Sequence, residues 1–344
     1  MEFSNCLIDW YLKNKRDLPW RKTTDPYKIW LSEIMLQQTR VAQGLPYYIR
    51  FTEQYPAVED LANAHEDEVL KLWQGLGYYS RARNLHATAK KVAFELNGKF
   101  PDTYKELLKL KGIGDYTASA IASISFGEGQ PVVDGNVYRV LARYFGVHTS
   151  INSSLGVKYF KELAHEVKHE KQIAIYNQAI MEFGANQCKP QSPDCKVCPL
   201  KGSCAALAKD EVKLLPVKIK KTKITKRYFN YIVFVDVNGN TLLQRRTKKG
   251  IWYNLYEFPL IETVTPVKNK SVLLEESYLQ DHHVVSMELF HKGDIIHKLS
   301  HQHLYTKFWI VHLHGNLPNG ISFARVKEYA VPVLVANFIE EFGF

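Results

Sequence analysis

The stretch that most constrains the fold runs from residue 104 to residue 146 and reads YKELLKLKGIGDYTASAIASISFGEGQPVVDGNVYRVLARYFG. Its pattern predicts a helix over 104–111, a tight Gly-Ile-Gly turn, a second helix from about Tyr116, and a third helix opened by VVDGN. Gly112 and Gly114 flank one apolar residue, so the backbone can turn sharply and approach another molecule closely. The N–H groups at the start of the next helix then point outward, where they can hold a phosphate.

Asp134 stands about twenty residues later, at the head of the third predicted helix, where the helix dipole favours an ionised carboxylate. Each piece alone is most simply an ordinary helix hairpin or an Asp that caps a helix. Their order, L-K-G-I-G-x-Y-T-A followed by V-D-G-N-V, is more specific. It resembles the helix-hairpin-helix DNA glycosylases, and the resemblance implies that the hairpin grips a DNA phosphate and that Asp134 is catalytic.

Composition agrees with a protein that binds nucleic acid. At 344 residues the chain is long enough for two domains. Lys and Arg outnumber Asp and Glu by 45 to 35, and this balance suits a polyanion, although a merely soluble basic protein shares it. No apolar run approaches the ~18 residues of a membrane span, and the start of the chain does not read as a signal or transit peptide. We therefore expect a cytoplasmic bacterial protein at the nucleoid, monomeric and without membrane contact.

A second candidate acid lies in KIWLSEIMLQQTRVAQGLPYY, which has helical periodicity. On one face of this pattern are Trp30, Ile34, Val41 and Leu45. Glu33, Gln37 and Arg40 share another face, and Glu33 alone would most simply be a solvated helix residue. However, an amide pair and a hydroxyl follow it, and such groups can enter a base stack and bond to base edges.

The motif W-L-S-E-I-M-L-Q-Q-T-R-V resembles the catalytic-Glu helix of the adenine DNA glycosylases of the MutY family. The resemblance implies that Glu33 protonates adenine and that Gln38 and Thr39 wedge into the duplex beside 8-oxoguanine. It continues in LPWRKTT, in WQGLGYYSRARNL and in I-M-E-F-G-A. The residues that it assigns to the adenine pocket are Trp20, Arg21, Leu36 and Glu182. It makes Tyr78 the intercalating residue, whereas core packing is the plain alternative for Tyr78 and Tyr79.

Tyr116 is the most diagnostic position in the hairpin. Relatives of the endonuclease III type, which also cleave the DNA strand, have a Lys at this place, and its amine forms a Schiff base with the sugar. Because Tyr116 cannot do so, we expect a monofunctional glycosylase that leaves the abasic strand intact. Tyr116 and Asn136 are expected to orient the two catalytic carboxyls, and Asp134 to act either electrostatically or through a covalent sugar adduct.

Four of the five cysteines lie within seventeen residues, with the spacing Cys188-x6-Cys195-x2-Cys198-x5-Cys204. This clustering suits a metal site in a reducing compartment better than a disulfide framework. A Cys₄ zinc site is the alternative, but such sites usually pair two C-x-x-C knuckles and only one is present. The spacing equals that of the endonuclease III and MutY group, which implies one [4Fe–4S] cluster.

The cluster loop, residues 188–204, is expected to present Lys196 and Lys201 to the DNA backbone rather than to transfer electrons as its main role. Residues 216–227 read PVKIKKTKITKR, six cations and no acid. By composition they form a linker, which either tracks phosphates or is a plain solvated connector.

Residues 228–344 change to strand-like patterns, with a final helix in VPVLVANFIEEF, and predict an α+β domain. NGNTLLQRRTKKGIWYNLYEFPL resembles the MutT-like (Nudix) C-terminal domain of MutY. The Nudix hydrolase signature is absent, since Glu275 and Glu276 stand outside its frame, so we expect recognition without nucleotide hydrolysis. Ser300 and His301 match the family's Phe-Ser-His loop, which reads 8-oxoguanine.

Two features of this region leave questions open. Leu299 replaces the aromatic residue of the Phe-Ser-His loop, so stacking from that position is in question. The histidines at 297, 301, 303, 312 and 314 suggest metal at first sight, but alternation on strands favours surface or core positions.

The sequence therefore predicts a multidomain protein. Its parts are an all-α helix-hairpin-helix glycosylase domain (1–215) with an iron–sulfur loop, a basic linker (216–227) and a MutT-like domain (228–344). The predicted reaction is excision of adenine mispaired with 8-oxoguanine or guanine in duplex DNA, with the base flipped out of the stack. The rival readings are a non-catalytic iron–sulfur module that binds DNA, a bifunctional glycosylase and lyase, and a pyrimidine-specific relative.

Overall fold

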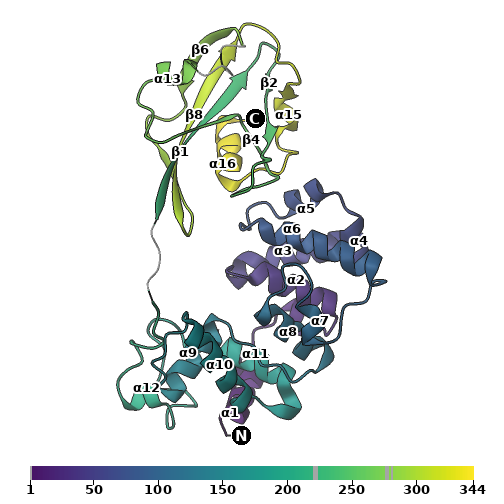
Figure 1. Cartoon of the computed structure of the whole chain (residues 1–344), viewed down its shortest axis with the longest axis vertical. Coiled ribbons are helices and arrows are strands. Elements are labelled where there is room, and N and C mark those ends of the chain that lie inside the picture. Colours follow the sequence, from purple (N-terminus) through teal and green to yellow (C-terminus); the bar gives the residue numbers. More distant parts are fainter. Residues whose placement is uncertain (1, 220–223, 276–278, 280–281) are drawn as a thin grey trace. The chain divides into compact units, whose positions relative to one another are not determined.

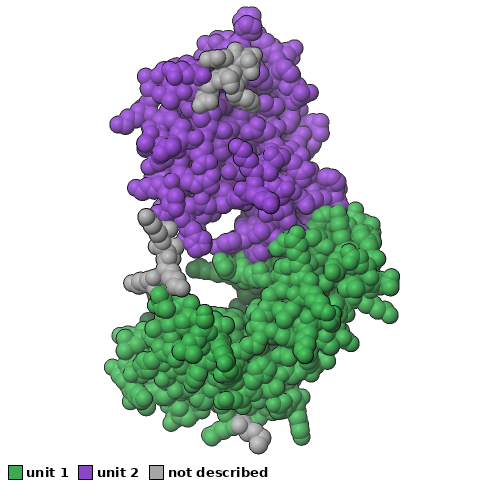
Figure 2. All heavy atoms as spheres, viewed as in Figure 1, with its two compact units in different colours: residues 1–63, 84–220 green, residues 64–83, 221–344 purple. Residues whose placement is uncertain are grey.

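The computed structural model describes residues 2–219, 224–275, 279 and 282–344. Contacts between Cα atoms divide the chain into two compact units (Figure 2). The first unit contains Met1–Asn63 and Asn84–Lys220, and the second contains Ala64–Arg83 and Lys221–Phe344. Among the described residues, no helix combines the length and the apolar character that crossing a membrane requires.

The first unit is helical (Figure 1). Its helices up to residue 63 are α1 (Glu2–Asn14), η1 (Pro19–Arg21), α2 (Pro26–Leu36), α3 (Val41–Gln54) and α4 (Val58–Asn63). From residue 84 to residue 145 the helices are the end of α6 (Ser80–Lys90), η2 (Lys91–Glu95), α7 (Tyr104–Leu107), α8 (Asp115–Phe126) and α9 (Gly135–Phe145). The last helices are α10 (Ser154–Val167), η3 (Glu170–Gln172), α11 (Ile173–Asn186) and α12 (Ala205–Ala208).

Helices α2, α8 and α11 lie at the centre of this unit, because each is apolar around most of its circumference. Helix α2 packs against α3 and α8, and α11 packs against α1, α8 and α9. Small residues in the ASAIASI run of α8 allow this close approach. The carboxyl of Glu33 is carried on a helix that is buried along most of its length, so the plain alternative of a solvated helix residue does not hold.

Helix α2 ends at Leu36, earlier than the sequence periodicity predicts. Gln37 is its C-cap, and Gln38 has a left-handed backbone (φ 54°) that no helix continues through. Val41 begins α3, so Val41 and Leu45 do not continue the apolar face of α2, and Gln37 and Arg40 do not share a helix face with Glu33. The amide and hydroxyl residues therefore lie in a turn.

The second unit is built on a mixed sheet with strand order β5-β1-β8-β6, in which β7 also pairs with β8. Its long central strands, β1 (Thr225–Val235) and β8 (Gln302–Leu313), are parallel, as Figure 1 shows. The antiparallel neighbours are β5 (Leu260–Thr263), β6 (Val284–Leu289) and β7 (Ile295–Lys298). Short pairs join β2 (Asn240–Thr241) to β9 (Ile321–Ser322) and β3 (Gln244–Arg245) to β4 (Tyr256–Glu257).

Helices and an aromatic core complete this unit. Its helices include α5 (Glu66–Leu72), the start of α6, α13 (Ser271–Leu274), α15 (Phe323–Val326) and α16 (Val333–Phe342). Phe338 of α16 stacks on Phe308 of β8, with ring centroids 4.0 Å apart, and covers one face of the sheet. On the other face, Ile232, Phe234 and Trp309 belong to a core closed by Val267, Leu273, Leu279 and Leu317.

Candidate active site

A cavity of about 520 Å³ lies among α2, α8, α9 and α11 of the first unit. Its lining brings together residues from five separate stretches of sequence. Nine of the predicted site residues line it: Trp20, Arg21, Glu33, Leu36, Thr39, Tyr116, Asp134, Asn136 and Glu182. Converging acids, an aromatic ring and charged partners in one concave site make this cavity the candidate active site.

Glu33 is 8% exposed, and its carboxyl lies in an unusual environment for an acid. Burial, and then repulsion from Asp134, raise the pKa of its carboxyl to about 7, and interaction with Tyr116 opposes the rise. Near neutral pH, this side chain therefore keeps a proton that it can donate.

Asp134 occupies the N-cap of α9. Its Oδ1 accepts the backbone N–H groups of Asn136 (2.9 Å) and Val137 (2.8 Å), and its Oδ2 accepts the Asn136 side chain (2.8 Å). Burial raises the pKa of Asp134, while these hydrogen bonds and the charge of Arg139 act to lower it. The helix start and its hydrogen bonds stabilise the ionised form and thus oppose the effect of burial.

Arg139 is buried and continues the support of Asp134, although it belongs to no recognised sequence motif. Its Nη2 donates to Asn136 Oδ1 (2.8 Å) and to the Gly184 carbonyl (2.6 Å), and its Nε donates to the Cys188 carbonyl (2.8 Å). A hydrogen-bonded chain thus joins the carboxylate of Asp134 to the first residue of the cysteine loop. The i, i+3 spacing from Asn136 is the only sequence signal for it.

Glu182 forms a second buried charge group at the cavity. Its carboxylate accepts Arg16 Nη2 (2.6 Å), Arg21 Nη2 (2.5 Å) and Asn186 Nδ2 (2.9 Å). Although burial acts to raise it, these arginines hold the pKa of Glu182 at about 2. Glu182 is thus a permanently ionised acceptor, and a base amine would have to displace one of its present partners.

Tyr116 completes the lining between the acids, and its hydroxyl donates to Met181 Sδ (3.1 Å). Arg16, Gln178 and Met181 are further lining residues that the motifs did not indicate. Gln38 does not line the cavity and is exposed, whereas Thr39 from the same turn does line it.

The predicted hairpin joins α7 to α8. Gly112 has φ 80°, and a Cβ there would lie 2.8 Å from Asn84 Cβ, so this position requires glycine. Gly114 is the N-cap of α8 in extended conformation, and no side chain caps the helix. The first N–H groups of α8 therefore have no side-chain cap, as a phosphate site requires.

The four clustered cysteines line one small cavity of about 30 Å³, together with Arg143 and Leu200. Arg143 Nη1 lies 3.4 Å from Cys188 Sγ. Burial, and then the charges of the other three thiols, raise the pKa of Cys198 to about 11, which reflects how close the four sulfurs lie. No group of three or more His, Cys, Asp or Glu among the described residues is arranged to hold a metal ion. Lys196 and Lys201 are exposed on the same loop, and Lys201 Nζ donates to the Lys196 carbonyl.

The remaining predicted residues lie in the second unit. Tyr78 is 49% exposed with φ 47°, whereas Tyr79 is 5% exposed, so core packing describes Tyr79 and not Tyr78. Ser300 and His301 are exposed in the turn between β7 and β8, and Leu299 is half-buried there. The hydroxyls of Tyr78 and Ser300 are hydrogen-bonded at 2.7 Å, which brings together two residues that are 222 positions apart.

Comparison with known proteins agrees with this geometry. A sequence model of the HhH-GPD superfamily of base excision DNA repair proteins matches residues 31–166, and a NUDIX domain model matches residues 230–341. The adenine DNA glycosylase of Buchnera aphidicola subsp. Baizongia pistaciae is 34% identical over 90% of this chain and 86% of its own length. The chain belongs to the adenine DNA glycosylase family.

Eukaryotic members are similar too: the adenine DNA glycosylase of Rattus norvegicus is 34% identical over 92% of this chain and 71% of its own. Among solved structures, a thermostable thymine-DNA glycosylase is 31% identical with a TM-score of 0.56, and the match covers 60% of this chain and 95% of that one. Endonuclease III in a non-covalent DNA complex, 24% identical with a TM-score of 0.53 over 61% of this chain and 95% of that one, shares the fold.

These matches confirm the predicted family and fold class, a helix-hairpin-helix glycosylase part followed by a Nudix-like part. As a member of the adenine DNA glycosylase family, the protein is a DNA glycosylase of base excision repair.

Proposed function

We propose that this glycosylase removes adenine mispaired with 8-oxoguanine, or with guanine, from duplex DNA and leaves the abasic strand uncut. The observation that carries the proposal is the pair of carboxyls in one cavity, with the pKa of Glu33 raised to about 7 and Asp134 capped by a helix start. The family match supplies the substrate class.

Cleavage of an N-glycosidic bond needs a protonated leaving base and support for a positively charged sugar. In the proposal, Glu33 donates the proton to the flipped adenine. Asp134 stays ionised and faces the developing oxocarbenium charge, while Asn136 and Arg139 keep its carboxylate in place. Asp134 acts either through its charge or through a transient bond to the sugar carbon.

Around this pair, other residues have supporting roles. Trp20, Arg21, Leu36 and Glu182 bind the base, and Tyr116 sits between the two acids. Gln38, Thr39 and Tyr78 enter the duplex, while Ser300 and His301 read 8-oxoguanine. Gly112, Gly114, Lys196 and Lys201 contact the DNA backbone.

We infer that Cys188, Cys195, Cys198 and Cys204 hold one [4Fe–4S] cluster. The inference is supported by the four soft thiol donors that line one cavity and by their spacing along the chain. The bound cluster would supply structural support to the loop that carries Lys196 and Lys201. Thiolate ligation would also fix Cys188, whose carbonyl accepts from Arg139.

The C-terminal part is proposed to recognise the lesion without hydrolysing nucleotides, because the hydrolase frame is missing around Glu275; Glu276 lies outside the described residues. We assign the protein to the bacterial cytoplasm as a monomer that acts on the nucleoid. Of the basic linker, positions 220–223 lie outside the described residues.

The test uses an end-labelled duplex with one adenine opposite 8-oxoguanine, incubated with purified protein and analysed with and without hot alkali. The proposal predicts strand cleavage only after alkali. Cleavage without alkali would show a lyase nucleophile, and tight binding without any cleavage would show a non-catalytic DNA-binding module. A duplex with adenine opposite guanine is expected to react more slowly, and one with adenine opposite thymine not at all.

A further inference from the structure

Among the described residues of the second unit, none forms a layer over one part of its sheet. On this side of the sheet, residues in the later parts of β1 and β8, such as Ile232 and Trp309, are buried in the core that also contains Val267 and Leu273. Toward the start of both strands, on the same side, Tyr228 and Tyr305 are half-exposed. Figure 1 shows this end of β1 and the hairpin into β8 extending beyond the rest of the sheet.

The pairing register fixes which side chains share this uncovered side. Lys226 pairs with His303 and Tyr228 with Tyr305 between β1 and β8. On the other side of β8, Lys298 pairs with His303 and Ile296 with Tyr305. Since paired residues point to the same side, these side chains form two rows across three strands. We call this surface the open face: Lys226, Tyr228, Ile296, Lys298, His303 and Tyr305.

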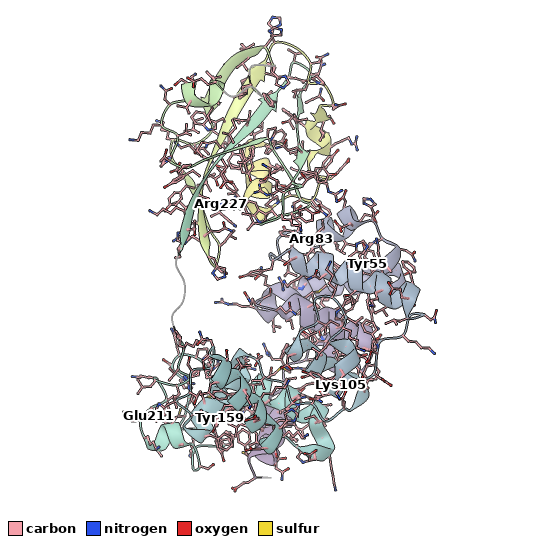
Figure 3. All side chains as sticks on the ribbon, in the orientation of Figure 1. Tyr55, Arg83, Lys105, Tyr159, Glu211 and Arg227 are labelled. Carbon is pink, nitrogen blue, oxygen red and sulfur yellow. The ribbon has the colours of Figure 1, made fainter. Side chains whose placement is uncertain are left out.

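The chemistry of the open face is cationic and aromatic. Lys226 and Lys298 are exposed, and no described acidic side chain forms an ion pair with either of them. Tyr228 and Tyr305 lie with ring centroids 5.3 Å apart, and Lys226 Nζ is 5.8 Å from the Tyr305 ring. The nearest β1 ion pair is on the opposite side, where Arg227 (labelled in Figure 3) binds Glu262 at 2.6 Å.

The open face is continuous with the turn that contains Ser300. Lys298 ends β7 directly before this turn, and His303 is the second residue of β8, which begins directly after the turn. If Ser300 contacts a base, then DNA next to that base must pass close to these residues. Ammonium groups neutralise phosphates, and tyrosines commonly hydrogen-bond to phosphate or sugar.

We propose that the open face is a DNA-binding surface of the second unit, which takes the sugar–phosphate backbone of the strand that carries 8-oxoguanine, beside the lesion. This inference rests on the proposed function. In it, Lys226 and Lys298 bind phosphates, while the paired tyrosines present their hydroxyls and ring edges to the sugars. Ile296, 48% exposed, supplies the apolar contact. Because these groups contact backbone, they strengthen binding without selecting a base.

Salt dependence of binding tests the proposal. The logarithm of the Kd of the full protein for an A:8-oxoguanine duplex is plotted against the logarithm of salt concentration, with turnover blocked by Glu33→Gln. Each phosphate contact contributes a slope of about 0.9, so Lys226→Gln with Lys298→Gln should lower the slope by about 1.8. At about 0.15 M salt the variant should bind roughly tenfold more weakly, to A:8-oxoguanine and A:guanine duplexes alike.

The matched control is Lys268→Gln with Lys327→Gln, which removes the same charge from the second unit outside the open face. An equal loss of slope in control and test would overturn the proposal, since it would reflect net charge alone. To test the tyrosine rings, the double variant Tyr228→Phe with Tyr305→Phe should weaken DNA binding less than the double variant Tyr228→Ala with Tyr305→Ala. Equal DNA affinity of these two variants and the unsubstituted protein would also contradict the proposal. Thermal melting of each variant confirms folding.

Failure of this proposal can be told apart from failure of the proposed function. If the protein excises adenine opposite 8-oxoguanine, but substitution of Lys226 and Lys298 leaves the salt slope unchanged, then the proposed function holds and the open face is not a DNA-binding surface. If the salt slope changes as predicted, but the protein shows no preference for 8-oxoguanine over guanine, then the open face binds DNA and the proposed specificity for 8-oxoguanine is wrong.

Discussion

Glu33 is a carboxyl placed where an apolar side chain would be more stable. Its helix is buried along most of its length, and desolvation raises the pKa of the acid to about 7. The same burial that destabilises the ionised form makes Glu33 able to hold a transferable proton near neutrality. Asp134 is also buried but accepts hydrogen bonds from a helix start, and this difference in surroundings is the basis of the different roles proposed for the two acids.

The rate of adenine excision should follow the protonation of Glu33. Because its pKa is about 7, the protonated fraction falls as pH rises through that value. The single-turnover rate at saturating enzyme should therefore drop roughly tenfold for each unit above about pH 8. Rapid-quench assays from pH 5 to pH 9 measure this dependence. An excision rate that does not change over that range would contradict the assignment of Glu33 as the acid.

The folding stability of the protein should depend on pH because the pKa of Glu33 is raised. In the unfolded chain Glu33 ionises near its ordinary value of 4.5, whereas in the folded protein it keeps its proton to about 7. As pH rises through this window, the unfolded state releases the proton first, so folding stability is lost. Glu33→Gln cannot ionise and should be more stable than wild type by roughly 3 kcal/mol at about pH 8, because a shift from 4.5 to about 7 costs roughly 1.4 kcal/mol per pKa unit. The difference should vanish near pH 4.5; denaturant unfolding at both pH values is the measurement.

Motifs in the sequence indicated Glu33, Asp134 and Tyr116 because each lies in a short, ordered pattern. Arg139 and Met181 were missed because their roles arise only when α9 and α11 pack around the cavity. Tyr78 could not be separated from Tyr79 by sequence, since adjacent tyrosines look alike until a turn buries one and exposes the other.

The sequence predicted the hairpin between α7 and α8 well, but it did not predict where α2 ends. Gly-Ile-Gly specifies its own turn, because few other residues adopt the left-handed backbone of Gly112. Apolar residues at 41 and 45 continue the period of α2 across a turn, so periodicity alone extended the helix too far. The position of Gln38 at φ 54° interrupts it, and no breaker such as Pro or Gly marks that place.

Substitutions in the hairpin should separate folding from DNA binding. Gly112→Ala forces a left-handed alanine against Asn84 and should cost roughly 2 kcal/mol of stability. Gly114→Ala is the matched control, because its Cβ meets nothing within 4 Å and its backbone is extended. It should melt like wild type yet bind DNA several-fold more weakly, because the added methyl group would obstruct the phosphate proposed to bind at this turn. Equal melting of both variants would argue against this description of the turn.

Residues 64–83 form an element whose grouping with the C-terminal part no sequence pattern indicated. Arg245 Nη2 lies 3.0 Å from Asp67 and 3.5 Å from Glu66, and Asn254 Nδ2 donates to Glu66 at 2.6 Å. These contacts join side chains far apart in the chain, so only the folded second unit reveals them.

The Arg245–Asp67 pair should show measurable coupling. Arg245→Glu and Asp67→Arg should each lower the melting temperature, and the double variant should recover most of the loss. The pair is about one-third exposed, so a coupling of roughly 0.5–1 kcal/mol is expected from a double-mutant cycle. Additive losses would mean that the two charges do not stabilise this element.

For the whole molecule, the predicted order of a helical glycosylase part and a Nudix-like part is confirmed by the family matches. The residues with proposed roles also divide between the units: the two acids and the cysteines belong to the first unit, and Tyr78, Ser300 and the open face belong to the second. Lesion recognition and bond cleavage should therefore be separable by mutation.

Ser300→Ala tests that separation. Loss of its hydroxyl, now bonded to Tyr78 at 2.7 Å, should reduce the preference for 8-oxoguanine over guanine opposite adenine by roughly tenfold. The excision rate for the A:guanine duplex should hardly change, because no residue of the cavity is altered. A parallel loss with both duplexes would show that Ser300 serves binding in general.

The central claim, that Glu33 and Asp134 perform the cleavage, is tested most directly by single-turnover excision with Glu33→Gln and Asp134→Asn beside wild type. Each variant should lose excision by at least roughly a thousandfold while binding an A:8-oxoguanine duplex with wild-type affinity. Near-normal excision by either variant, with its fold and binding intact, would contradict the account.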